Sequence, residues 1–186
     1  MTTVKVANKM QRGSYELSAP QGRWPADLGF SPALSPREML KLGVFEGWYL
    51  QSAISEYPAS WFKGARLALG GPDPAINALG VKSRQPLSVW LGKGWINPQD
   101  PRGWFEWYCR FYMGRRSADD DRQIKRWRAF VRHSAQVVKR GNGDPLLRRV
   151  QRQALLQWAR DPFPDVRTRR GESVFDKCKR ILKEQE

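Results

Sequence analysis

Few side chains in this sequence of 186 residues have the type and spacing that catalysis requires. The single histidine, His133, lies in an Arg-rich segment without a second histidine at metal-ligand spacing, so we expect a surface or capping role for it. The GGPD sequence at 70–73 lacks the Lys-Ser/Thr of a phosphate-binding loop, and LGKG at 91–94 is too short to form one. We therefore expect no metal centre, no cofactor and no nucleotide hydrolysis.

A lone carboxylate can still support some reactions, such as base excision or transfer at a DNA base. The carboxylates that could serve are Asp73, Asp100, Asp120 and Glu46, and the sequence does not distinguish among them. Asp120 belongs to a run of three aspartates at 119–121, directly before a predicted helix. The simplest role of this run is to cap that helix, because three adjacent carboxylates rarely converge on one metal ion.

A surplus of positive charge is the strongest feature of the composition. The chain holds 33 Lys and Arg against 18 Asp and Glu, a formal net charge of +15. Residues 102–170 alone carry 18 basic and 7 acidic residues, a net charge of +11. A charge that serves only solubility would be spread evenly, so this concentration favours a face that binds a polyanion, with DNA preferred to RNA. The alternatives are a solvated surface and, less favoured, an anionic membrane surface.

The basic residues follow a helical pattern in the densest part of this region. Ile124, Trp127 and Val131 form an apolar stripe, and the Arg and Lys residues between 115 and 140 lie off it, which predicts a cationic face behind a buried one. Residues 148–152 extend this face. The side chains predicted to contact nucleic acid are Lys82, Arg84, Ser88, Lys93, Arg115, Arg116, Arg122, Lys125, Arg126, Arg128, Arg132, Lys139, Arg148, Arg149 and Arg152.

Nine tryptophans exceed what a core of this size usually requires. Trp24 and Trp95 are flanked by turn residues, so we predict that these two are partly exposed and can stack on a base. The other reading keeps them in the core. Helical spacing assigns five further tryptophans to the core: Trp48, Trp104, Trp107, Trp127 and Trp158.

The elements that must position these residues are predicted to be helices. SPRE at 35–38 is a capping box that starts a helix ending at Gly43, and Ser173 is placed to cap the last helix. No period-two alternation continues beyond four residues. We therefore predict an all-α fold, a single compact helical domain of about six or seven helices. Apolar spacing places other helices at 44–57, 101–113, 120–140 and 145–160.

The predicted organisation has four parts. Residues 1–34 form an irregular N-terminal arm, 35–160 a helical basic domain, 161–172 a linker, and 173–186 a C-terminal amphipathic helix. Cys109 and Cys178 lie in amphipathic segments and are expected to be buried free thiols. The sequence holds no stretch of membrane-spanning length and no apolar signal-peptide core, so we expect an intracellular protein, cytoplasmic or in the nucleoid or nucleus.

Residues 78–96, ALGVKSRQPLSVWLGKGWI, resemble the helix-turn-helix of excisionase-like and mercury-resistance-regulator-like proteins. The resemblance implies that Lys82, Arg84 and Ser88 face the DNA groove and read bases. Pro86 and the short helix before it depart from the usual pattern. The alternative is a capped surface helix without groove contact.

A wider resemblance covers about residues 35–160. SPREMLKLGVFEGWY, GVKSRQPLSVW, GWINPQDPRGWFEWYCRFYMGRR, RQIKRWRAFVRH and RRVQRQALLQWA are similar to a family of small Trp- and Arg-rich proteins of bacteria, fungi and plants, which brings no established activity with it. A looser likeness links this family to helical enzymes that act on modified thymine in DNA. No site residue can be carried over from either.

The expected function is DNA binding by a helical protein, with residues 115–140 and 148–152 on phosphates and residues 79–96 as a possible base reader. The first alternative is a DNA-base-modifying enzyme, acting by thymine hypermodification, amino-acid or polyamine transfer, or glycosylase-like chemistry. The second alternative is an RNA-binding subunit.

Overall fold

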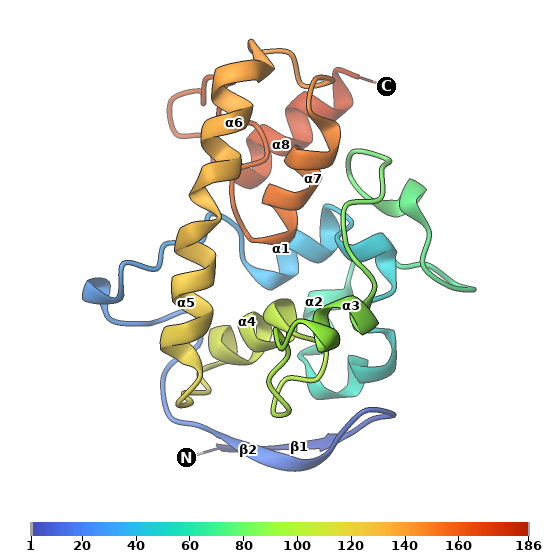
Figure 1. The fold of residues 1–186 in the computed structure, drawn as a ribbon, viewed down its shortest axis with the longest axis vertical. Helices are drawn as coiled ribbons and strands as arrows, with labels where there is room; N and C mark the ends of the chain where they lie inside the picture. The colour runs from blue at the N-terminus through green and yellow to red at the C-terminus, as the bar shows by residue number, and fades with distance from the viewer. Residues whose placement is uncertain (1, 186) are drawn as a thin grey trace.

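The computed structural model describes residues 2–185 and is mainly helical, with one small antiparallel sheet (Figure 1). The described α-helices are α1 (Pro36–Lys41), α2 (Ala59–Phe62), α3 (Leu87–Gly92), α4 (Trp104–Met113), α5 (Asp120–Ala129), α6 (Val131–Gly141), α7 (Arg149–Gln157) and α8 (Val174–Lys183). The strands are β1 (Thr2–Ala7) and β2 (Arg12–Leu17). Four short 3₁₀ helices complete the description: η1 (Ala26–Leu28), η2 (Phe45–Gly47), η3 (Gln51–Glu56) and η4 (Pro74–Ile76). The prediction of a helical protein is confirmed in this coarse form, whereas all-α is too strict.

Residues 2–17 correct part of the prediction that 1–34 form an irregular arm. They form a hairpin in which β1 pairs antiparallel with β2, from Thr2 opposite Leu17 to Ala7 opposite Arg12. In Figure 1 the hairpin lies across the lower end of the molecule. Its inward positions, among them Val6 and Tyr15, are too few to stand out as an alternating pattern, and their burial comes from the body beneath them.

Helix α4 forms the centre of the core. Its aromatic residues recur at three and four positions, so Trp107, Tyr108 and Phe111 are buried on nearly all sides. The ring of Phe30 packs edge-on against these three residues and against Trp127, with ring centroids 4.9–5.9 Å apart. This aromatic cluster joins the segment before α1 to α4 and α5.

The local capping predictions are confirmed. The Ser35 hydroxyl accepts a hydrogen bond from the Glu38 backbone N–H, and the Glu38 carboxylate accepts one from the Ser35 N–H at 2.8 Å. Ser173 accepts from the backbone N–H of Asp176 at the start of α8. Cys109 and Cys178 are buried free thiols, also as predicted.

Three predicted helices differ from the structure. Residues 44–57 form η2 and η3 instead of an α-helix, because Phe45 and Glu46 adopt left-handed backbone angles with φ of 52° and 61°. The helix over 120–140 is divided at Phe130 into α5 and α6, which follow each other along one side of the molecule in Figure 1. The next helix begins only at Arg149, since the left-handed Arg148 (φ 60°) precedes it.

Two expectations about apolar residues are also corrected. Trp48, assigned to the core by its spacing, is 40% exposed, because the helix that would have turned it inward does not form. Val131 and Val138 lie on the outer side of α6. In the other direction, Phe163 of the expected linker is buried, and the segment therefore packs on the body.

A buried network of charges centred on Arg110 connects the hairpin, η3, the loop before α4 and α4 itself. The Arg110 guanidinium donates to both carboxylate oxygens of Glu56, at 2.6 and 3.0 Å, and to Asp100 at 3.1 Å. It also donates to the side chain of Gln11, at the start of the hairpin's second half. Arg115 donates to the other oxygen of Asp100 at 2.6 Å. Since buried charges are costly unless they are paired, each member of this network requires the others.

The first prediction concerns this network. Arg110→Met removes the cation but keeps most of the side-chain volume, and it leaves Glu56 and Asp100 as buried, undercompensated anions. We expect urea-induced unfolding to show a loss of about 3–5 kcal/mol. The matched control is Arg37→Met on the exposed side of α1, which should change stability by less than about 0.5 kcal/mol. An Arg110 variant as stable as this control would contradict the structural role of the network.

Candidate nucleic-acid interface

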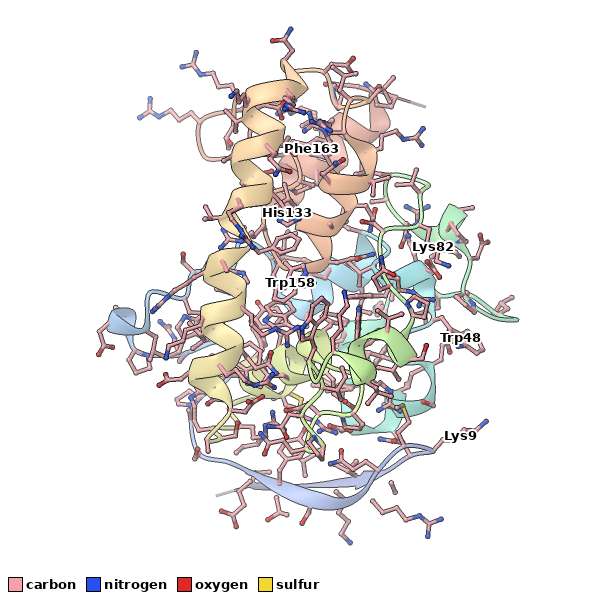
Figure 2. The ribbon with its side chains drawn as sticks, viewed as in Figure 1. Lys9, Trp48, Lys82, His133, Trp158 and Phe163 are labelled. Atoms are coloured by element: carbon pink, nitrogen blue, oxygen red, sulfur yellow. The ribbon has the colours of Figure 1, made fainter. Side chains whose placement is uncertain are left out.

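A cavity of about 730 Å³ opens between α5 and α6 on one side and α7 on the other. The start of α4, with Trp104 and Phe105, and the segments at 82–85 and 95–96 complete its walls. Figure 2 shows His133 on α6 and Trp158 after α7 beside this space, with Lys82 on the loop at its right. A volume of this order is typical of cavities that hold a small molecule.

Aromatic rings cover one wall of the cavity in a continuous stack. His133 lies parallel to Phe130, with ring centroids 4.0 Å apart and an interplanar angle of 6°. Phe130 stacks in turn on Trp158 at 4.9 Å, and Trp158 packs against Trp104 at 4.6 Å. The division between α5 and α6 falls at Phe130, which places its ring at the centre of this stack. The wall is therefore apolar, and within the stack the ring faces cover one another.

Four cationic side chains line the same cavity: Lys82, Arg84, Arg126 and Arg132. Within the described residues, the lining includes no carboxylate. Two more cations lie next to it, because Lys93 sits 4.8 Å above the Trp95 ring and Arg122 approaches the Trp95 carbonyl. These contacts gather six of the predicted basic residues at one place.

Arg126 is a cation of the cavity lining without a carboxylate partner. Its guanidinium donates to the Trp95 carbonyl at 3.1 Å and to the Gln123 side chain at 3.0 Å, both neutral groups. It also lies over the rings of Trp95 and Trp158, at 5.9 and 5.6 Å. Burial, followed by the nearby Arg122, lowers the pKa of Arg126 from its usual range. A half-buried guanidinium in this setting favours the approach of an anion.

Arg84 is held at the cavity wall by a buried acid behind it. The Arg84 guanidinium donates to Glu46 at 2.7 Å, and the Glu46 side chain is only 3% exposed. The second carboxylate oxygen of Glu46 has no hydrogen-bond partner. Of the four predicted catalytic candidates, Glu46 is thus the one near the cavity. It does not line the cavity itself, but it pairs with Arg84, which does.

The other three carboxylate candidates have structural partners. Asp100 belongs to the Arg110 network. Asp120 accepts hydrogen bonds from the Trp107 indole at 2.8 Å and from Ser117. Asp73 is exposed and caps η4 by accepting from the Ala75 N–H. None of the three lines the cavity. The aspartate run does not cap α5 as expected, because the side chain of its N-cap residue Asp119 accepts no hydrogen bond from a backbone N–H of the first turn and Asp120 bonds to Trp107 and Ser117 instead.

Several predicted phosphate ligands are instead neutralised inside the protein. Arg115 is buried against Asp100, and Arg152 is fully buried and pairs with Asp165 at 2.7 Å. These two predictions are wrong, because both side chains are buried and pair with carboxylates inside the protein. Arg122 pairs with Asp119 but keeps a 40% exposed side chain.

The remaining predicted ligands lie at the surface or bond to backbone carbonyls. Arg116 donates to the Arg23 carbonyl, Arg128 to the Leu28 carbonyl and Arg149 to the Leu79 carbonyl. Hydrogen bonds to neutral carbonyls leave the positive charge uncompensated. The predicted residues that are exposed without such a bond are Ser88, Lys93, Lys125 and Lys139, and Arg148 is half-buried.

The two tryptophans proposed for base stacking differ. Trp95 is 40% exposed and lies on the cavity edge, in agreement with the prediction that it is partly exposed. Trp24 donates its indole N–H to the Phe30 carbonyl at 2.7 Å and packs against the rings of Phe30 and Phe111. Its ring is committed to the core, so a stacking role for Trp24 is not supported.

The 78–96 segment does not form a helix-turn-helix. Its only α-helix, α3, has six residues, and the element before it is the three-residue η4. The extended Pro86 at the start of α3 and the turn at Gly80 separate the two, and Arg84 points to Glu46. The departures noted in the sequence, Pro86 and the short preceding helix, therefore decide the local geometry.

Sequence reasoning missed the unpartnered polar atoms that four cavity-lining residues bury. Tyr49 Oη, Trp104 Nε1, Gln157 Nε2 and His133 Nδ1 are buried without a hydrogen-bond partner. In the sequence these residues occupy ordinary core or helix positions. No spacing could have marked them, because an unpartnered atom is a property of the packed structure.

Comparison with protein-family models, with curated proteins and with solved structures gave no match in any of the three. Function must therefore be inferred from the side chains themselves. Among the described residues, no helix is long and apolar enough to cross a membrane, and no group of three or more His, Cys, Asp or Glu side chains could hold a metal ion.

The second prediction uses the single histidine as a reporter of the cavity. Burial and the adjacent Arg132 lower the pKa of His133 below 6.5. In ¹H NMR the one imidazole should therefore titrate with a midpoint below 6.5, and Arg132→Ala should raise that midpoint by removing a like charge. An anion bound in the cavity should also raise it. A midpoint at 6.5 that is unaffected by Arg132→Ala would show that this environment is absent.

Proposed function

We propose that this protein binds nucleic acid, with DNA as the principal partner, and that the phosphates are held by cationic side chains at the cavity. The observation that carries this proposal is the placement of Lys82, Arg84, Arg126 and Arg132 around a cavity whose described lining has no carboxylate. Arg84 pairs with Glu46 behind the wall, but Lys82, Arg126 and Arg132 have no carboxylate partner among the described residues. Their positive charges create a local field that attracts a polyanion.

Arg126 supports the choice of phosphate as the ligand. A guanidinium that is half-buried between two indole rings has lost part of its hydration and has gained only neutral partners. A phosphate oxygen would restore charge-assisted hydrogen bonds to it, and Arg geometry suits such bidentate contacts. Exposed Lys93 and Lys125 extend the positive surface beyond the cavity.

The proposal does not include base reading by a helix-turn-helix, because α3 has only six residues and the element before it, η4, has three. In its place, the 40% exposed indole of Trp95, next to Arg126 at the cavity edge, offers stacking. This kind of contact discriminates little among sequences and depends more on whether a base is accessible.

A DNA-base-modifying enzyme is the second candidate function, and Glu46 is the observation that favours it. Its carboxylate is buried, has one unpartnered oxygen and lies directly behind Arg84 at the cavity. The test is to incubate the protein with ordinary and with hydroxymethylated DNA and to weigh the released nucleosides. A mass change that Glu46→Gln abolishes supports the enzyme, and unchanged nucleosides in both DNAs leave binding as the function.

The third prediction tests phosphate contact. The double variant Lys82→Ala/Arg132→Ala should bind duplex DNA of any sequence more weakly, and the slope of log K against log salt should fall in magnitude by about 2, since each lost phosphate contact removes about 0.9. Fluorescence anisotropy at several salt concentrations measures both quantities.

The matched control for this experiment is Lys5→Ala/Lys9→Ala, which removes two exposed lysines from the hairpin region at the other end of the molecule. This control should leave the slope nearly unchanged. Affinity that does not depend on salt in the unmodified protein would refute the proposal. A parallel competition with RNA of equal length decides between the DNA and RNA readings.

A further inference from the structure

Four residues that line the cavity carry a polar atom without a hydrogen-bond partner: Tyr49 Oη, Trp104 Nε1, Gln157 Nε2 and His133 Nδ1. These atoms have almost no accessible surface, so they are not contacts that a ligand in the cavity can make. The groups that the cavity exposes are the ones that indicate its ligand.

The aromatic lining restricts what the ligand can be. In the ring stack of His133, Phe130, Trp158 and Trp104 the ring faces cover one another, whereas Trp95 at the cavity edge is 40% exposed and Trp90 lines the cavity as well. A planar heteroaromatic ring can stack on an exposed indole, and a lipid chain makes no use of such a flat face.

The cations add the second half of the ligand. Arg126 and Arg132 belong to the same lining as the stacked rings, and Arg126 contacts the Trp158 ring directly. A planar ring joined to an anion describes a nucleotide. We propose that the cavity receives one nucleotide, with its base against the Trp95 indole and its phosphate at Arg126 and Arg132.

This proposal rests on the proposed nucleic-acid binding, and it specifies the state of the partner. A base inside a duplex is stacked on both faces and cannot enter a cavity, so the preferred ligand has an unpaired base that is easily turned out of the helix. The cations next to the cavity, Lys93 and Arg122, then meet the flanking phosphates. A free mononucleotide has the same chemistry and is distinguished below.

The fourth prediction compares three probes by anisotropy and competition: a duplex with one unpaired bulged nucleotide, the same duplex fully paired, and thymidine 5′-monophosphate. We expect the bulged duplex to bind about tenfold more tightly than the paired one, the effect of stacking one additional base. If thymidine 5′-monophosphate competes as well as the bulged duplex, the ligand is a free nucleotide. Equal affinity for both duplexes, without competition by the mononucleotide, overturns the proposal.

Filling the cavity provides the test by mutation. Ala154 lines the cavity on α7, so Ala154→Phe should remove the preference for the bulge while leaving the affinity for the paired duplex intact. The matched control is Ala135→Phe, at an exposed position of α6 that does not line the cavity, and it should retain the preference. If the unmodified protein binds none of the DNA probes, the proposed function itself is refuted. If Ala154→Phe keeps the preference for the bulged duplex, only the role of the cavity is refuted.

Discussion

The arrangement of this protein depends on the need to neutralise Arg110. Its guanidinium is 1% exposed and therefore must be surrounded by acceptors from several segments. Glu56 of η3, Asp100 of the loop before α4 and Gln11 of the hairpin supply them. These contacts fix α4 relative to the N-terminal half of the chain. The first turn of the same helix places Trp104 and Phe105 in the cavity wall, so the buried network also fixes the position of this part of the wall.

The positive charges divide into two groups with opposite roles. Arg102, Arg110, Arg115 and Arg152 pair with buried carboxylates and stabilise the fold. At the cavity, by contrast, only Arg84 has a carboxylate partner, while Arg126 has neutral ones. The positive charges behind the net charge of +15 are therefore not all free to attract an anion. A polyanion is attracted where cations lack carboxylate partners, and the cavity is such a place.

The sequence predicts features that are decided locally, and fails where distant contacts decide. Ser35 and Ser173 cap helices as expected, because a cap depends on residues three positions apart. Arg152 and Arg132 look alike in the sequence, but the partner of Arg152 is Asp165, 13 positions away and brought close only by the packing of the segment after α7. The hairpin was missed for a related reason, since its strands are buried by the body and carry little pattern of their own.

The left-handed turn at 45–46 links the fold to the candidate site most directly. Non-glycine residues at φ of 52° and 61° are each unfavourable by about 1–3 kcal/mol, so other contacts must hold them. Asn77 does so by accepting from the Glu46 N–H at 2.7 Å and donating to the Val81 carbonyl at 2.7 Å. The turn places the Phe45 ring on the cavity wall and the Glu46 carboxylate behind Arg84. A regular helix over 44–57, which the apolar spacing predicts, would form the backbone hydrogen bonds without the free-energy cost of two left-handed residues. It would also carry these two side chains away from the cavity, and the strained turn is therefore best understood through what it positions.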